Sequence, residues 1–274
     1  MGNAKSTPSQ TNIACLYAYY EKNEAYRRNL EFFLQHGLLP HVTYYIIING
    51  TCSATVPRQK NVTVFHRENA GFDFGAYDYV LSLVDMSSFD YVFFLNTSVR
   101  GPYLDLVPSG DWTQPFIDLL KKNADTKLVG TSINVLDSWS ADWRLPYLLL
   151  GDQEKALHPH VQSMFFAVDK ECLRFLRSKN TFSVGPSDTM ASIIGRIEIG
   201  MSYNVLANGW NIDCVLPGYT GLDYRTMTSN PNPSSTDPYN LNTYFYTTIK
   251  PADVIFFKTN RGLPEPPMVV DTKE

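Results

Sequence analysis

The sequence predicts an α/β fold in which a mostly parallel sheet is flanked by helices within a single domain. Short apolar runs occupy residues 12–19, 42–48, 61–66 and 91–95, and each ends in polar residues. Continuous runs rich in β-branched and aromatic residues are typical of strands buried on both faces of a parallel sheet. Helical spacing of apolar residues separates several of these runs, and alternation of strand and helix indicates a parallel sheet.

The first hundred residues follow this alternation closely. Residues 21–36 place apolar side chains on one helical face, and Gly37 can end that helix. After the strand at 61–66, we expect a Gly-rich turn at 69–75 and a helix at 76–84. Asn and Gly tolerate left-handed backbone, so this turn can approach a ligand closely.

The rest of the chain yields a less regular prediction. We expect helices at residues 115–122, 169–178 and 187–208, strands at 128–132, 161–168, 214–217 and 254–257, an irregular segment at 137–160, and a surface loop at 230–246.

Composition and the chain ends define the domain and exclude some functions. We expect one domain at 12–262, with a flexible leader at 1–11 and a flexible tail at 263–274. The net charge of −4 gives no electrostatic footprint for nucleic acid. Four widely spaced cysteines without a CxxC pair indicate free thiols in a reducing compartment.

The sequence also predicts a cytoplasmic location. No apolar run reaches the roughly 18 residues that a spanning helix needs. The first residues fit the N-myristoylation pattern, with Gly2 exposed once Met1 is removed. A single acyl chain there would give weak peripheral membrane contact. The alternative is an unmodified polar leader.

Polar residues follow the strand at 91–95, and they indicate a binding site. Asn96, Thr97, Ser98 and Arg100 come directly after this run. In open α/β sheets, ligands bind at the carboxyl ends of the strands. We therefore expect this segment and the turn at 69–75 to form one rim of a ligand site.

Five motifs, taken in order, resemble those of GT-A-fold glycosyltransferases. The resemblance is greatest to the rhamnan-synthesis type and to its relatives in large algal DNA viruses, xylosyltransferases among them. It is carried by Asn69-x-Gly71-x-Asp73-Phe74-Gly75-Ala76-Tyr77, Phe94-Leu95-Asn96-Thr97-Ser98-Val99-Arg100-Gly101-Pro102, His160-Val161-Gln162-Ser163-Met164-Phe165-Phe166, Glu198-Ile199-Gly200-Met201-Ser202 and Phe256-Phe257-Lys258-Thr259-Asn260-Arg261.

This resemblance implies a GT-A-like, Rossmann-like sheet and a sugar-transfer reaction. The enzyme would move a sugar from a nucleotide-diphosphate donor, a UDP-sugar such as UDP-xylose, to a hydroxyl group of a glycan or glycoprotein acceptor, with inversion. A viral origin would place it in the host cytoplasm. The implied donor contacts are Tyr17, Ala18, Asn49, Asn69, Gly71, Asp73, Gly75, Asp78, Asn96, Thr97, Ser98, Arg100, Lys258 and Arg261. For Asn69 and Gly71, the alternative is a plain tight turn.

The metal site that such enzymes usually carry departs from the family pattern here. Asn96 and Ser98 stand where an acidic pair is usual, and Mg²⁺ or Mn²⁺ favours charged oxygen ligands. We therefore expect weak or absent dependence on Mn²⁺ or Mg²⁺. Either cationic side chains neutralise the diphosphate, or a metal is held elsewhere, by Asp73 or Asp78; the candidate cations are Arg100, Lys258 and Arg261.

Glu198 is the candidate general base that takes a proton from the acceptor hydroxyl. It lies between apolar residues in a predicted helix, where water would be partly excluded. The alternative is a carboxylate paired with Arg196 or Arg225. Asp73 is a second candidate catalytic residue, whereas Asp188 fits a helix N-cap better than a base.

Several residues in the irregular segment and in the strand that follows it are candidate acceptor contacts, namely Trp139, His158, His160, Gln162 and Ser163. Core packing or a structural histidine is the alternative for each aromatic or imidazole ring. Two other functions stay open. One is a catalytically inactive module that binds carbohydrate or nucleotide sugar. The other is a nucleotidyltransferase, which would need an acidic metal-binding pair.

Overall fold

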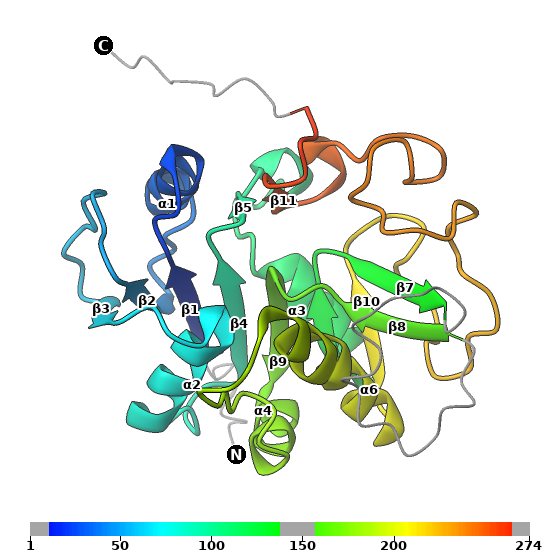
Figure 1. Ribbon diagram of the computed structural model, residues 1–274, viewed down its shortest axis with the longest axis horizontal. Helices are drawn as coiled ribbons and strands as arrows, with labels where there is room; N and C mark the ends of the chain where they lie inside the picture. The colour runs from blue at the N-terminus through cyan, green and yellow to red at the C-terminus, as the bar shows by residue number, and fades with distance from the viewer. Residues whose placement is uncertain (1–10, 138–156, 265–274) are drawn as a thin grey trace, which may run out of the picture.

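The computed structural model describes residues 11–137 and 157–264. Its centre is a seven-stranded sheet in the order β10-β6-β9-β4-β1-β2-β3 (Figure 1). All neighbouring pairs are parallel except those that β9 makes with β4 and β6. The predicted α/β class, a mostly parallel sheet flanked by helices, is therefore confirmed.

The strands of this sheet have the bounds β1 Ile13–Tyr19, β2 Val42–Asn49, β3 Val62–Arg67, β4 Tyr91–Asn96, β6 Thr126–Gly130, β9 Phe165–Asp169 and β10 Asn211–Cys214. Two small antiparallel pairs lie beside it, formed by β5 Val99–Arg100 with β11 Phe257–Lys258 and by β7 Ile133–Asp137 with β8 Leu157–Val161.

The helices are α1 Glu24–His36, α2 Phe72–Leu83, α3 Gln114–Lys122, α4 Lys170–Ser178, α5 Met190–Ile193 and α6 Gly200–Ala207, with a π-helix η3 Ile194–Ile199 between the last two and single 3₁₀ turns η1 Leu104–Leu106 and η4 Pro251–Asp253. None of the helices in the described residues is both long and apolar enough to cross a bilayer.

Aromatic side chains alternate between the two faces of the central strands β4 and β9. Phe93 packs against Trp112, with ring centroids 5.3 Å apart, on the face that α3 covers. The next residue, Phe94, stacks on Phe166 at 4.6 Å and meets Tyr77 of α2 on the other face. Because successive side chains of a strand point to opposite faces, these runs build two buried layers and give the sheet helices on both sides.

The chain reverses its direction of winding between β1 and β4. From β1 it proceeds outward through β2 to β3, then returns to place β4 on the opposite side of β1. Ala18, near the end of β1, is in register with Asn96 at the end of β4. Such a switch point leaves a crevice at the carboxyl ends of the two strands.

Two predicted boundaries near this crevice were wrong. Helix α2 begins at Phe72, so Asp73 and Gly75 lie in its first turn rather than in the preceding loop. The predicted strand at 161–168 is divided, because Val161 ends β8 whereas β9 begins at Phe165. Apolar composition alone did not reveal the break at residues 162–164, where the chain moves from one sheet to another.

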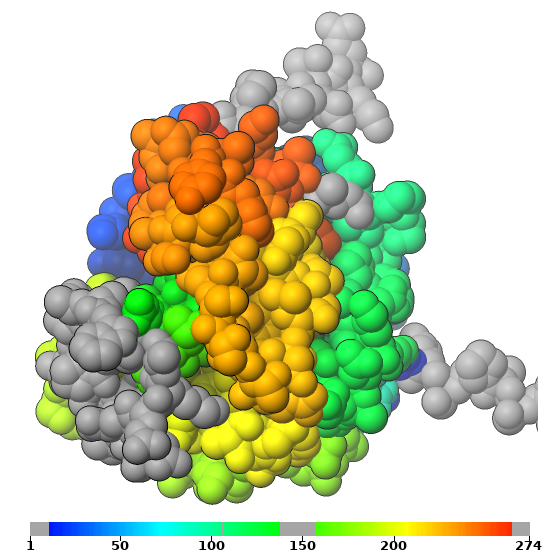
Figure 2. All heavy atoms as spheres, turned by 90° about the vertical axis from the view of Figure 1, so that its right-hand side faces the viewer, coloured from blue at the N-terminus to red at the C-terminus, as the bar shows by residue number. Residues whose placement is uncertain are grey.

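Other differences concern the second half. The predicted irregular segment at 137–160 includes β8, the strand predicted at 214–217 is β10 at Asn211–Cys214, and that at 254–257 is reduced to β11. The helix predicted at 187–208 begins at Met190 and contains the π-turn. Residues 230–246 do form a surface loop without a helix or strand, and this loop (orange) makes up part of the face seen in Figure 2. The predicted leader, all but residue 11, and the tail beyond residue 264 lie outside the described residues.

Candidate functional site

A pocket of about 520 Å³ lies at the switch point. Segments far apart in the sequence meet there, from the ends of β1, β2 and β4, the start of α2, the residues before β9, the α5–η3 helix and β11. Ten of the predicted site residues line it: Ala18, Asn49, Asn69, Asp73, Asn96, Thr97, Ser98, Ser163, Glu198 and Lys258.

Asp73, Asn96 and Ser98 form one hydrogen-bonded unit in this pocket. The Asn96 Nδ2 atom donates to Asp73 Oδ2 at 2.6 Å. The Asn96 Oδ1 atom accepts from both the Ser98 backbone nitrogen, at 2.9 Å, and the Ser98 hydroxyl, at 2.6 Å. The predicted rim between the turn at 69–75 and the segment after β4 is thus brought together by a direct contact.

This unit fits a divalent cation poorly. Both polar atoms of the Asn96 amide are used within the unit, and the Asp73 Oδ1 atom accepts from the Phe74 backbone nitrogen at 3.1 Å. In the described part of the chain, no cluster of three or more His, Cys, Asp or Glu side chains could hold a metal ion. Hard divalent ions favour several charged oxygen ligands.

Glu198 reaches the pocket from the π-helix η3, where the wider turn occurs between α5 and α6. π-turns are rare and often occur at functional positions. The Ser163 hydroxyl donates a short hydrogen bond to Glu198 Oε2. His160 Nε2 lies 3.8 Å from Glu198 Oε1. Glu198 is therefore held from β8 and from the turn before β9.

The two arginines that could have paired with Glu198 form ion pairs with other carboxylates. Arg196 pairs with Asp188 at 2.7 Å, and Arg225 pairs with Asp125 and with Asp223. The N-cap expected at Asp188 is instead Thr189, whose side chain accepts from the Ser192 backbone nitrogen.

The pocket contains opposite charges at close range. Burial raises the pKa of Asp73, an effect that the Asn96 hydrogen bond opposes and the nearby Glu198 carboxylate reinforces. Burial lowers the pKa of Lys258, whereas the Glu198 carboxylate works in the opposite direction. A half-buried lysine facing two carboxylates is an electrostatic arrangement typical of functional sites.

The two arginines predicted beside Lys258 do not line the pocket. Arg261 Nη2 pairs with Asp237 at 2.9 Å. Arg100 is buried, and its Nε atom donates to Asn29 Oδ1 at 3.0 Å. The Asn29 Nδ2 atom in turn donates to the Thr97 carbonyl oxygen and to the Thr259 hydroxyl, each at 2.8 Å. Arg100 and Asn29 thus fasten the segment that carries Lys258 to the end of β4.

Tyr17, Gly71, Gly75 and Asp78, which were predicted as donor contacts, do not line the pocket. The Tyr17 ring is fully buried against Phe33, with centroids 5.0 Å apart. Gly71 is the left-handed N-cap of α2, while Gly75 and Asp78 lie within that helix.

Asn49 is oriented by a residue that the sequence did not single out. Arg67 Nη1 donates to Asn49 Oδ1 at 2.6 Å, and its Nη2 atom donates to the Ala70 carbonyl oxygen at 2.9 Å. One guanidinium group therefore fixes the end of β2 relative to the turn before α2. The hydrogen bond to Asn49 Oδ1 also fixes the orientation of the Asn49 side-chain amide.

The predicted acceptor residues are divided among several places. Ser163 lines the main pocket, and His160 lies behind Glu198. Gln162 accepts from the Ser132 hydroxyl at 2.7 Å and donates to Asp237 at 3.3 Å. Trp139 lies outside the described residues.

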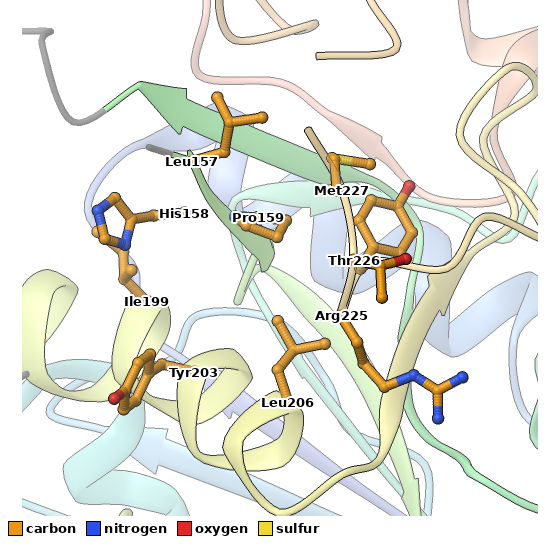
Figure 3. A pocket seen from close by; sticks show the side chains of 10 residues that line it. Leu157, His158, Pro159, Ile199, Tyr203, Leu206, Arg225, Thr226 and Met227 are labelled. Carbon is orange, nitrogen blue, oxygen red and sulfur yellow. The ribbon is translucent and has the colours of Figure 1, made fainter. Parts of the chain in front are cut away.

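His158 instead lines a second pocket of about 240 Å³ (Figure 3). This pocket lies between β8, the η3–α6 helix and residues 224–227. His158 and Tyr203 lie on one side of it, and the Arg225 guanidinium points away from the other labelled side chains. Ile199, the neighbour of Glu198, also lines it, so the η3–α6 helix contributes to both pockets.

Sequence reasoning missed ten residues that line the main pocket: Tyr20, Lys22, Tyr26, Phe72, Phe74, Met164, Met190, Ile193, Ile194 and Asn260. Tyr20 and Lys22 had a usable signal, because they follow the first strand at its carboxyl end. Met190, Ile193 and Ile194 had none, since apolar residues of a helix read as core.

No protein-family model matches the sequence, and no curated protein matches it significantly. A mannosyltransferase from Pyrobaculum calidifontis, solved with GDP-Man and Mn²⁺, is similar over 75% of this chain and 55% of its own, with 9% identity and a TM-score of 0.46. A 4-diphosphocytidyl-2C-methyl-D-erythritol synthase from Anaerococcus prevotii is similar over 80% and 92%, with 10% identity and a TM-score of 0.41.

The S. aureus protein TarS, as its residues 1–349, is similar over 72% of this chain and 56% of its own, with 7% identity and a TM-score of 0.40. This chain thus spans just over half the length of the mannosyltransferase and of the TarS fragment.

Proposed function

We propose that this protein is a glycosyltransferase that moves a sugar from a nucleotide-diphosphate donor, a UDP-sugar, to a hydroxyl group of a glycan acceptor, with inversion. One observation carries the proposal. The pocket at the switch point holds Glu198, Asp73 and Lys258 together among neutral amide and hydroxyl groups. The pocket thus offers suitable groups for a nucleotide diphosphate, for a sugar, and for an acceptor hydroxyl that must give up its proton.

The nucleoside would occupy the end of the pocket formed by β1 and β2. Ala18 and Asn49 end these strands, and Asn69 lies in the turn that Arg67 anchors. Tyr20 and Tyr26 add aromatic surface beside them. Amide groups that read a base edge, together with a ring for stacking, are the usual means of nucleoside recognition.

Lys258 would neutralise the diphosphate. It is the cation of β11 that lines the pocket, close enough to Glu198 and Asp73 to interact electrostatically with both. The donor set of Asp73, Asn96 and Ser98 does not fit a divalent ion, so the proposal needs no metal. Thr97 and Ser98 supply further polar groups at the end of β4.

Glu198 would be the general base. As the acceptor hydroxyl oxygen attacks the anomeric carbon, its proton passes to the Glu198 carboxylate. The bond from the anomeric carbon to the diphosphate oxygen breaks, and its electron pair leaves with the diphosphate. Ser163 and His160 hold the carboxylate in place, and Asp73 would contact hydroxyl groups of the donor sugar.

The finer assignments belong to the same proposal and are supported by the sequence motifs. They are the rhamnan-synthesis or algal-virus lineage, a UDP-xylose donor, a glycoprotein acceptor, a cytoplasmic location in the host, the single domain at 12–262 and acylation at Gly2.

Thermal stabilisation across UDP-, GDP- and TDP-sugars, each with and without Mn²⁺, tests the donor site. We expect a UDP-sugar to raise the melting temperature most, with little change on adding Mn²⁺. An equal response to all nucleotides, or no response, would remove the donor assignment.

The variant Glu198→Gln keeps the size of the side chain and its hydrogen bond to Ser163 but cannot accept the proton. We expect UDP-sugar stabilisation to persist while transfer falls by roughly 10²–10⁴-fold. Wild-type binding without any transfer would instead favour the inactive binding module.

A further inference from the structure

Phe72 has a backbone conformation that aromatic residues rarely adopt. Its φ angle is +55°, directly after Gly71 at +71°. Six non-glycine residues in the described ranges have positive φ, and Phe72 is the one among them that lines the main pocket. A bulky side chain in the left-handed region is strained, and such strain is found most often at functional sites.

The Phe72 side chain is also exposed where an apolar ring would ordinarily be buried. Phe72 is 40% exposed, and Tyr20 at 42% and Met190 at 57% are further large apolar side chains exposed on the same pocket wall or rim. Its neighbours Phe74 and Tyr77 on α2 are buried. Exposed apolar surface in a pocket that also carries polar and charged groups marks a contact for the apolar part of a ligand.

We propose that Phe72 is a platform for a sugar ring, whose face of C–H groups packs on the aromatic ring. This inference rests on the proposed function and adds a specificity-determining residue to it. Phe72 lines the same pocket as Asp73 and Glu198, so a sugar ring that packs on it would share this pocket with the proposed reacting groups. The left-handed backbone at Phe72 accompanies a side chain that is exposed in the pocket, whereas Phe74 of the same helix is buried.

A sugar ring at this place has two sources, the donor and the acceptor. The donor sugar is tested by comparing UDP with the UDP-sugar that stabilises the wild-type protein best. If the donor sugar stacks on Phe72, Phe72→Ala weakens binding of the UDP-sugar by roughly three- to tenfold, and UDP binding is unchanged. Phe72→Tyr, which keeps the ring, restores the affinity.

The acceptor is tested by the ratio of sugar transfer to donor hydrolysis, with methyl glycosides of glucose, galactose, xylose and rhamnose as acceptors. If the acceptor stacks on Phe72, Phe72→Ala lowers this ratio by a similar factor and leaves donor binding intact. Leu83→Ala, at the exposed far end of the same helix, is the matched control and should change neither measurement.

The backbone gives an independent readout. Phe72→Gly should melt about 2–4 °C above Phe72→Ala, because only glycine adopts positive φ without strain. Equal weakening of UDP and UDP-sugar would assign the ring to the nucleobase and overturn the proposal, as would unchanged binding and transfer in Phe72→Ala. A wild-type protein that binds no nucleotide sugar would instead contradict the proposed function itself.

Discussion

At the scale of single residues, the Asp73 carboxylate in the main pocket lowers the stability of the folded protein at neutral pH. Burial raises the pKa of Asp73, so the folded chain holds this proton more tightly than the unfolded chain. Stability therefore falls as pH rises from the unfolded value of about 3.9 through the raised value, and at neutral pH the ionised carboxylate destabilises the fold.

Removing this charge should separate stability from function. We expect the stability of Asp73→Asn relative to the wild type to be about 0.5–1 kcal/mol higher at pH 7 than below the carboxyl pKa, and transfer activity to be lower. The comparison is made between two pH values because Asn also replaces one accepting oxygen with an amide nitrogen, a loss that does not depend on pH. Denaturant unfolding and a transfer assay measure the two effects, and a stability difference that stays constant with pH would contradict this account.

A second prediction for a single residue concerns the charge of Lys258. Its lowered pKa means that the ammonium group loses its proton at a lower pH than an ordinary lysine. If this cation binds the diphosphate, the affinity for UDP falls as pH rises through that lowered value. Lys258→Met should weaken UDP binding by roughly tenfold or more at neutral pH and abolish the alkaline decline.

Titration calorimetry between pH 6 and pH 10 measures this dependence. The exposed residue Lys60 offers a control, since Lys60→Met should leave both the affinity and its pH profile as in the wild type. An unchanged alkaline decline in Lys258→Met would assign the titration to another group.

At the scale of elements, the close approach of β6 to its neighbours depends on one glycine. A Cβ atom added at Gly130 would overlap the Val161 side chain and lie 3.1 Å from the Phe165 carbonyl oxygen. Val161 ends β8 and Phe165 begins β9, so this contact fixes the turn that carries Ser163 to Glu198.

Gly130→Ala should therefore destabilise the protein by about 2 kcal/mol and disturb the Glu198 site. A loss in melting temperature with a matching loss in transfer is the expected result. Gly185→Ala is the control, because its nearest atom, Asp188 Oδ2, would lie 3.6 Å away. Equal effects of the two substitutions would show that steric overlap is not the cause.

At the scale of the whole molecule, the sequence predicted the sheet better than the site. The strands at β1, β2, β3 and β4 have long apolar runs that end in polar residues, and their order indicated the crevice. The antiparallel direction of β9 and the break before it depend on long-range pairing, which apolar composition does not encode. The π-turn at Glu198 has no local sequence signature either.

The site residues show the same contrast between features that have a local sequence signal and features that depend on distant partners. Asn49 and Asn69 were predicted from the resemblance, Asn96 as a polar residue after a strand and Glu198 as an acid among apolar residues, and all line one pocket. Arg100 and Arg261 were predicted as diphosphate contacts from the motifs and their charge, whereas their partners Asn29 and Asp237 lie 71 and 24 residues away. Which cation stays available to a ligand is decided by such distant partners.

The pairing of β11 with β5 joins Lys258 to Val99, residues that lie far apart in the sequence. Asn29 ties both of these segments to α1. During synthesis on a ribosome, the sheet from β1 to β4 can assemble long before β11 has emerged. Lys258 would thus reach the pocket among the last folding steps, and any nucleotide binding that depends on Lys258 would have to wait until this segment has folded.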